Sequence, residues 1–155
     1  MPMKIATFNA NSLRVRLPQV LAWMDREGAD VLCVQETKVQ DKDFPRTSIE
    51  NAGYHVAFAG QKSYAGIATL SHTPPAEVQA GFDDGTDKPR FLYTRIDGMH
   101  VVNTYVPQGR SPDHEEFRRK LTWFGQLRAW FEAHLTPNDP VVWVGDFNVA
   151  VEDID

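Results

Sequence analysis

The sequence has little of what stabilises proteins outside the cell. Cys33 is the single cysteine in 155 residues, so no disulfide can form within one chain. The disulfide-rich secreted class is therefore excluded, and the usage fits a reducing compartment. Cys33 lies in the apolar run 31–34, where a cysteine behaves as a small buried hydrophobe. We expect a cytoplasmic protein.

Long apolar runs and an excess of positive charge are also missing. No stretch approaches the roughly 20 apolar residues of a membrane-spanning helix, and the first residues lack the apolar segment of a signal peptide. We therefore expect no membrane partner. Sixteen basic and 21 acidic residues give a net charge of −5. This balance disfavours a nucleic-acid partner, although a local basic face can coexist with an acidic whole.

The first part of the chain has the pattern of a strand, a helix and a second strand. Residues 4–9 are predicted to form a short strand, and a helix is expected from Pro18 to a glycine stop at Gly28. Residues 30–35 are almost continuously apolar, which is typical of a strand buried on both faces. Together these elements predict a βαβ unit.

Shorter strands and one long helix follow. We expect a short helix between Phe44 and Gly53, strands over 54–59, 67–70 and 91–96, and a type I′ turn at Asp97-Gly98 into a strand over 99–106. The longest helix is predicted to open at 111–113, and a last strand begins at Val141. The apolar stripe of this helix is Phe117, Leu121, Phe124, Leu127, Phe131 and Leu135. Its opposite, solvated face carries Arg118, Arg119, Lys120 and Arg128.

This layout predicts a mixed sheet covered by helices, in the α/β class. At least one sheet face has no obvious partner among these residues. We expect residues 1–155 to form the N-terminal part of a single domain.

Polar groups stand where apolar strands end. They are Asn9, Glu36 and Asp146, the last followed by Asn148. Strand ends present side chains to a site, and a carboxylate directly after a buried strand is costly without a partner. One or two carboxylates with several waters suit Mg²⁺, the remaining coordination coming from a substrate phosphate. Taken alone, Asn9 is equally a turn or cap residue, but the joint arrival of all four favours a site.

Four short motifs carry a family resemblance. In chain order they span residues 7–14, 34–38, 105–109 and 145–148. Together they resemble exodeoxyribonuclease III and bacterial abasic-site endonucleases, within the endonuclease/exonuclease/phosphatase (DNase I-like) family, over residues 3–155. The resemblance implies the N-terminal half of a four-layer α/β sandwich with mixed β-sheets. It also implies a metal-assisted attack of water on a phosphodiester.

The resemblance also implies roles for single residues. Glu36 ligates Mg²⁺, with Mn²⁺ as a possible replacement, and Asn9 and Asp146 complete the metal site. Tyr105 contacts the scissile phosphate through its hydroxyl, and Asp146 aligns or activates the water. Asn148 steadies Asp146 and the phosphate, and Asn9 also contacts substrate.

Further substrate contacts are expected around these residues. Arg14 and Lys38 stand close in sequence to the site and bind flanking phosphates, although each is equally a solvated charge. Tyr64 lies in a loop, 61–66, that resembles the loop approaching the DNA backbone in nucleic-acid-cleaving relatives. The alternative is an ordinary hairpin loop with a half-exposed tyrosine. Gln108 follows Tyr105 and lines the substrate edge.

The expected partner is double-stranded DNA with abasic sites or 3′ ends, in base-excision repair. The family uses a late Asp-His pair that these residues lack. We therefore expect the chain to be the N-terminal part of a longer polypeptide that is monomeric at full length. One alternative is a phosphoinositide or sphingomyelin phosphoesterase of the same fold. Another is a non-catalytic binding relative or half-domain assembly, in which a second copy covers the open sheet face.

Overall fold

Two four-stranded sheets form the centre of the computed structural model, which describes residues 2–152 and 154. Sheet A has the order β1 (Ile5–Asn9), β2 (Val31–Gln35), β4 (Ile67–Ser71), β3 (His55–Ala59). Sheet B has the order β5 (Glu77–Ala80), β6 (Phe91–Ile96), β7 (Met99–Tyr105), β8 (Val141–Asp146). β1 runs parallel to β2 and β7 parallel to β8, whereas all other neighbours are antiparallel. The predicted mixed β-sheets are confirmed.

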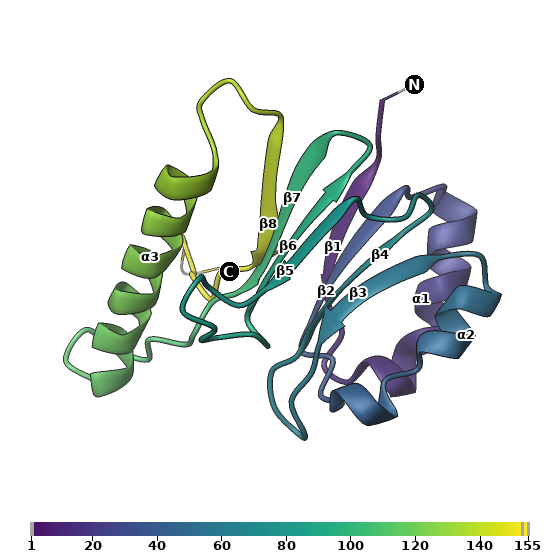
Figure 1. Cartoon of the computed structure of the whole chain (residues 1–155). Coiled ribbons are helices and arrows are strands. Elements are labelled where there is room, and N and C mark those ends of the chain that lie inside the picture. The colour runs from purple at the N-terminus through teal and green to yellow at the C-terminus, as the bar shows by residue number, and fades with distance from the viewer. Residues whose placement is uncertain (1, 153, 155) are drawn as a thin grey trace.

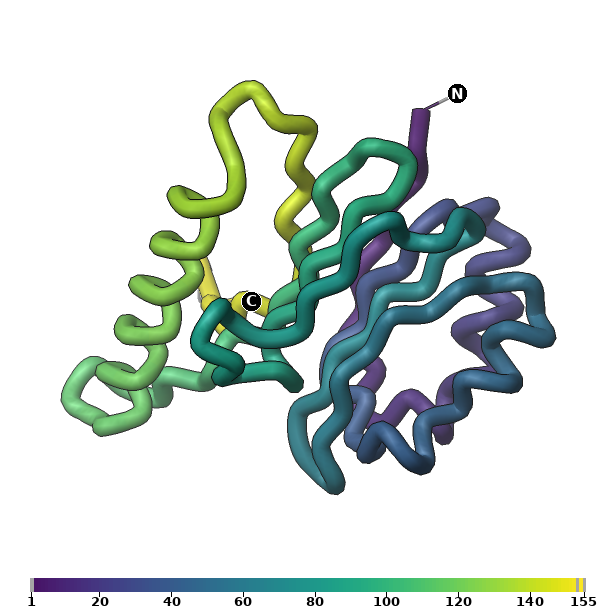
Figure 2. Tube along the Cα trace, in the orientation of Figure 1, coloured from purple at the N-terminus to yellow at the C-terminus, as the bar shows by residue number. Residues whose placement is uncertain are grey.

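Helices cover the outer faces of both sheets. α1 (Leu13–Glu27) and α2 (Arg46–Asn51), with the 3-10 turn η1 (Asp41–Asp43), lie against sheet A, and α3 (Glu115–His134) lies on the far side of sheet B (Figure 1). The order helix, sheet, sheet, helix is the four-layer α/β sandwich that the sequence predicted. The trace in Figure 2 shows the two sheets splayed between these helical layers. Among the described residues, no helix has the length and apolar character needed to span a bilayer.

Three apolar layers hold these elements together, because each sheet must bury both faces. The layers are Leu13, Leu17, Val20, Met24 and Leu32 under α1; Val31, Cys33, Ile96 and Val101 between the sheets; and Phe91, Val102, Trp123, Leu127 and Trp130 under α3. Cys33 is buried, as predicted, and burial raises the pKa of its thiol to about 12. The thiol therefore stays protonated and serves as packing.

The predicted start of α1 at Pro18 is wrong. The helix begins at Leu13, and Pro18 lies inside it. Tertiary contacts explain the earlier start, because the backbone N–H groups of Ser12 and Leu13 donate to the carbonyl oxygens of Glu36 (2.8 Å) and Thr37 (3.1 Å). These bonds satisfy donors that a free helix end leaves open. The predicted stop is confirmed, since Gly28 caps the helix at φ 62°.

The predicted faces of α3 need a correction. The helix begins at Glu115, where His114 caps it by accepting from the N–H of Glu116. Its buried residues are Lys120, Trp123, Leu127 and Trp130. Leu121, placed on the buried stripe from sequence, is 55% exposed, and Lys120, placed on the solvated face, is buried. The two tryptophans decide the helix rotation, because Trp130 packs on Phe91 of β6 and Trp123 packs on Phe82 in the loop after β5.

The connections within sheet B include one predicted and one unpredicted feature. Asp97 (φ 50°) and Gly98 (φ 81°) both have positive φ, as the predicted type I′ turn requires. β5 was missed by the sequence. Its first half is exposed, and the segment holds one valine and one alanine beside polar residues in place of an apolar run, so only its pairing with β6 makes it a strand.

The position directly before Asp146, at the end of β8, requires a glycine. A Cβ on Gly145, whose φ is +142°, lies 1.9 Å from the carbonyl oxygen of Thr104 on β7. We expect Gly145→Ala to lower the free energy of unfolding by at least about 3 kcal/mol, measured by urea denaturation. The matched control is Gly125→Ala in α3, where nothing lies within 4 Å of the new methyl group. This control is expected to gain about 0.5–1 kcal/mol, and equal stability of both variants contradicts the close approach.

Candidate active site

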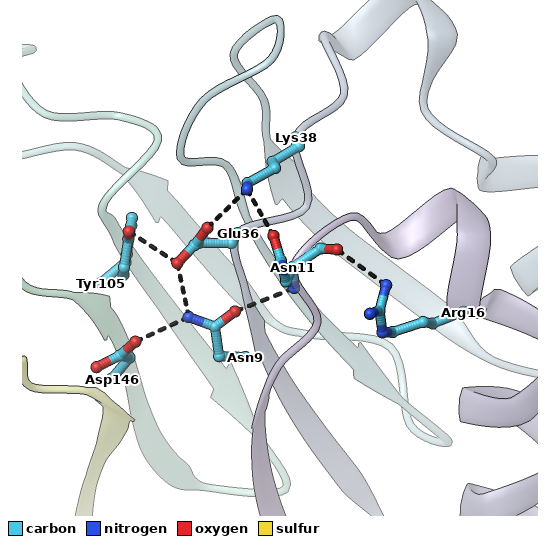
Figure 3. Close-up of polar contacts among 7 residues, drawn as sticks. All are labelled: Asn9, Asn11, Arg16, Glu36, Lys38, Tyr105 and Asp146. Carbon is cyan, nitrogen blue, oxygen red and sulfur yellow. Dashed lines mark hydrogen bonds and ion pairs between the residues drawn. The ribbon is translucent and has the colours of Figure 1, made fainter.

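Four strand ends from the two sheets meet at one edge of the sandwich (Figure 3). Asn9 ends β1 and Glu36 directly follows β2, which runs parallel to it; Tyr105 and Asp146 end the parallel pair β7 and β8. Because each pair is parallel, its two ends lie at the same level, with Tyr105 opposite Asp146 in the register. The fold thereby gathers side chains that stand far apart in the sequence.

A single amide joins the acids of the two sheets. The Nδ2 group of Asn9 donates to Oε1 of Glu36 at 2.9 Å and to Oδ2 of Asp146 at 2.8 Å. The hydroxyl of Tyr105 donates to the same Glu36 oxygen at 2.9 Å. The Oδ1 atom of Asn9 accepts from the backbone N–H of Asn11 at 3.0 Å, which fixes the orientation of the amide. Figure 3 shows this connected set of contacts.

Glu36 is held in its charged form. Burial acts to raise its pKa, but hydrogen bonds from Asn9, Tyr105 and Lys38 outweigh that effect and keep the pKa below its ordinary value. The Nζ atom of Lys38 lies 3.1 Å from Oε2 of Glu36 and donates to Oδ1 of Asn11 at 2.5 Å. Glu36 (φ 51°) and Lys38 (φ 53°) both adopt positive φ, the kind of backbone strain that clusters at functional sites.

Tyr105 remains a neutral donor. Burial, the hydrogen bond to Glu36 and the charge of Glu36 raise the pKa of its phenol to about 12. The guanidinium carbon of Arg90 lies 4.6 Å from the Tyr105 ring centroid, and its Nη1 donates to the Tyr105 carbonyl oxygen at 3.2 Å. Arg90 was missed from the sequence, because only the pairing of neighbouring strands brings it to the site. Burial lowers its pKa from a high ordinary value.

Three hydrogen bonds fix the segment after β8. The backbone N–H of Asn148 donates to Oδ1 of Asp146 at 2.9 Å, and its Nδ2 donates to the carbonyl oxygen of Val106 at 2.6 Å. The buried ammonium of Lys120 donates to the carbonyl oxygen of Asn148. Lys120 is thus a positioning residue that sequence reasoning missed. Its helical spacing with Trp123, Leu127 and Trp130 was the signal that could have found it.

A cavity of about 540 Å³ opens beside these side chains, lined among others by Asn9, Asp146 and Asn148. A slightly larger cavity, about 570 Å³, lies between β1 and α1 and is lined by apolar and neutral groups with one arginine, including Phe8 and Trp23. The cavity of about 540 Å³ is the better candidate site, because Asn9, Asp146 and Asn148 of the strand-end group line it.

The structure gathers most of the residues that the sequence singled out. Asn9, Glu36, Lys38, Tyr105, Asp146 and Asn148 form one connected group. Their individual roles stay predictions.

Three predicted substrate residues lie outside that group. Arg14 is exposed on α1; its neighbour Arg16 is the one that reaches the site, donating to the carbonyl oxygen of Asn11 at 2.9 Å. Tyr64, 72% exposed, lies in the loop between β3 and β4. Gln108 is exposed after β7. The predicted substrate contacts of Arg14, Tyr64 and Gln108 stay predictions.

The donor set fits a small, hard cation. Two carboxylates, Glu36 and Asp146, face one shared amide, and Lys38 already places a positive charge at Glu36. Within the described residues no group of three or more His, Cys, Asp or Glu side chains gathers as a metal cage. One or two carboxylates completed by water and phosphate are the set that Mg²⁺ prefers, and soft metals need the thiolates or imidazoles that are missing from this group.

The fold and the strand-end group define the class of four-layer α/β sandwiches with an acid-and-amide site at one edge. The chain belongs to the Endonuclease/Exonuclease/phosphatase family, whose sequence pattern matches residues 6–155. The predicted family is therefore confirmed.

Individual proteins with similar sequences and structures are consistent with this family assignment. Exodeoxyribonuclease III of Haemophilus influenzae is 36% identical over 99% of this chain and 60% of its own length. The solved AP endonuclease from Archaeoglobus fulgidus is 41% identical, with a TM-score of 0.93 over 99% of this chain and 60% of that one. A Neisseria 3′ phosphatase bound to a product DNA hairpin is 35% identical, with a TM-score of 0.91 over 99% of this chain and 61% of that one. The chain thus spans about 60% of the length of each of these three proteins.

Proposed function

We propose that this chain carries the N-terminal site residues of a Mg²⁺-dependent DNA repair nuclease. Its substrate is double-stranded DNA with abasic sites or 3′ ends, and Mn²⁺ is a possible replacement metal. The observation that carries the proposal is the bridge from Asn9 to Glu36 and Asp146, which unites two acids from different sheets. The names of the relatives support the choice of DNA as substrate.

The reaction class is attack of water on a phosphodiester. Glu36 and Asp146 would hold the divalent cation, which would supply positive charge to the phosphate oxygens. Tyr105, kept neutral, donates its hydroxyl proton to Glu36 in the free site and turns it to a phosphate oxygen when substrate binds. Asp146 orients the water and accepts its proton. The backbone N–H of Asn148 holds the Asp146 carboxylate in place, and Lys120 fixes the carbonyl oxygen of Asn148 in turn.

Local charge favours an anionic substrate despite the acidic chain. The cations Lys38 and Arg90 lie against Glu36 and Tyr105, and Lys120 lies behind Asp146. Phosphate binding depends on such local cations more than on net charge. A net charge of −5 therefore does not conflict with a DNA substrate.

Metal removal tests the reaction. We expect the protein, as its host produces it, to cleave an abasic duplex in Mg²⁺ and to lose at least about a hundredfold in rate after chelation. Re-addition of Mg²⁺ restores the rate. The measurement is the initial rate on labelled duplexes with an abasic site, a blocked 3′ end or neither. The melting temperature with and without chelator controls for unfolding.

The same assay distinguishes the substrate class. Inositol phosphates and sphingomyelin are supplied in parallel with the abasic duplex. Faster hydrolysis of the inositol phosphates or of sphingomyelin than of the abasic duplex overturns the nuclease proposal but keeps the reaction class. A cleavage rate that chelation leaves unchanged overturns the metal-dependent reaction itself.

A further inference from the structure

Two fully buried amides connect the sheets directly beneath the candidate site. Gln35, 1% exposed, is the last residue of β2 and immediately precedes Glu36. Asn103, 0% exposed, lies on β7 two residues before Tyr105. The Nε2 group of Gln35 donates to Oδ1 of Asn103 at 2.8 Å, across the gap between sheet A and sheet B.

Both side-chain amides have hydrogen-bond partners. The Nδ2 group of Asn103 donates to the carbonyl oxygen of Ala68 at 2.9 Å, with longer contacts to Val34 and Thr69. In the part of the chain that the structure describes, all these partners belong to sheet A although Asn103 belongs to sheet B. Gln35 is held in turn by the hydroxyl of Thr7, at 3.1 Å, within its own sheet. The pair therefore acts as a cross-link between the sheets.

The surroundings make this cross-link unusual. The inter-sheet layer is mainly apolar, built around Val31, Cys33, Ile96 and Val101, and the hydroxyls of Thr7 and Thr69 lie beside the two amides. Apolar contacts are non-directional, so by themselves they leave the sliding of one sheet on the other weakly specified. Hydrogen bonds fix distance and angle. Stability alone is served equally well by apolar side chains of the same shape, so the amides point to a geometric role.

The active-site contacts depend on the relative placement of the two sheets. Glu36 comes from sheet A, whereas Tyr105 and Asp146 come from sheet B. The bonds between them are only partly buried. The buried amides lie one and two residues below these groups. A shift between the sheets therefore moves Glu36 away from its partners.

We infer that Gln35 and Asn103 are positioning residues that set the separation of Glu36 from Tyr105 and Asp146, and through it the affinity of the site for a divalent cation. The part concerning the cation rests on the proposed function. The part concerning geometry does not.

The test uses three variants and one control. Gln35→Met and Asn103→Leu each leave one buried amide without its partner and are expected to lower the melting temperature by about 5 °C. The double variant removes both amides and recovers most of that loss. The control is Ile49→Val in the fully buried core under α2, which loses stability by cavity formation far from the site.

Calorimetric titration with Mn²⁺ is the first readout. We expect the affinity to fall about tenfold in both single variants and to stay low in the double variant, while Ile49→Val keeps the wild-type affinity. A purely stabilising pair predicts that affinity follows the melting temperature. Wild-type affinity in Asn103→Leu, or an equal loss in Ile49→Val, therefore overturns the inference.

The second readout needs no metal. The side-chain amide of Asn9 donates to both sheets, so its hydrogen exchange, followed by NMR, reports their relative placement. We expect exchange to accelerate by about tenfold in Asn103→Leu and in the double variant, and to stay slow in Ile49→Val. Unchanged exchange in Asn103→Leu overturns the inference. If the wild type binds no Mn²⁺, the proposed function fails while the Asn9 signal still decides the geometry.

Discussion

Asp146→Asn is expected to lower the rate of phosphodiester cleavage by about a thousandfold. The carboxylate accepts from the backbone N–H of Asn148 at Oδ1 and from Asn9 at Oδ2. An asparagine keeps the shape of the side chain, but it loses the negative charge that accepts a proton from water. It also turns an N–H group toward one of the two donors. The measurement is kcat on an abasic duplex at saturating Mg²⁺.

The control for Asp146→Asn is Asp113→Asn, an exposed acid before α3. Both variants are expected to unfold in one cooperative transition, because Asp146 is only partly buried at the cavity edge. A cleavage rate close to wild type in Asp146→Asn contradicts its assignment as the group that orients and deprotonates water. A low rate in Asp113→Asn as well shows that the loss of any one negative charge lowers the rate, whether or not it lies in the site.

Glu36→Gln is expected to weaken Mn²⁺ binding and to lower cleavage, each by at least about a hundredfold. Three donors meet the carboxylate, from Asn9, Tyr105 and Lys38. A glutamine presents an NH₂ group to at least one of them and leaves the ammonium of Lys38 without its counter-ion. Titration calorimetry measures the affinity, and cleavage is followed over a range of Mg²⁺ concentrations.

Glu115→Gln on the exposed first turn of α3 is the matched control for Glu36→Gln. Full recovery of the rate at high Mg²⁺ assigns Glu36 to metal binding alone. Wild-type affinity for Mn²⁺ in Glu36→Gln excludes it as a ligand. Because kcat of Asp146→Asn is measured at saturating Mg²⁺, it reports the role of Asp146 toward water, whereas Glu36→Gln reports binding of the cation.

Features carried by local patterns were predictable. β2 is a short apolar run, and its five residues are all buried, so the strand and the position of Glu36 after it followed from the sequence. The turn at Asp97-Gly98 followed from the conformational freedom of those two residue types. The four-layer fold followed from the motifs of the family. Each of these predictions rests on short stretches of consecutive residues, so it does not depend on how distant parts of the chain pack.

Features that depend on distant contacts were missed or misplaced. α1 starts early because of bonds to the residues after β2, and Lys120 is buried because the tryptophans of α3 dock on sheet B. Arg90 reaches the Tyr105 ring only because β6 pairs with β7. β5 is a strand only because β6 lies beside it.

The sequence by itself determined which chemical groups stand at the strand ends, because strand periodicity and turn chemistry are local properties. The tertiary structure alone decided how these groups meet. Asn9 and Asp146 are 137 positions apart and share a hydrogen bond, and Glu36 and Tyr105 are 69 apart. Hydrogen bonds act only at short range and in fixed directions, so such contacts exist only after the two sheets have packed. That packing also lowered the pKa of Glu36 through its new hydrogen bonds and placed Gln35 against Asn103.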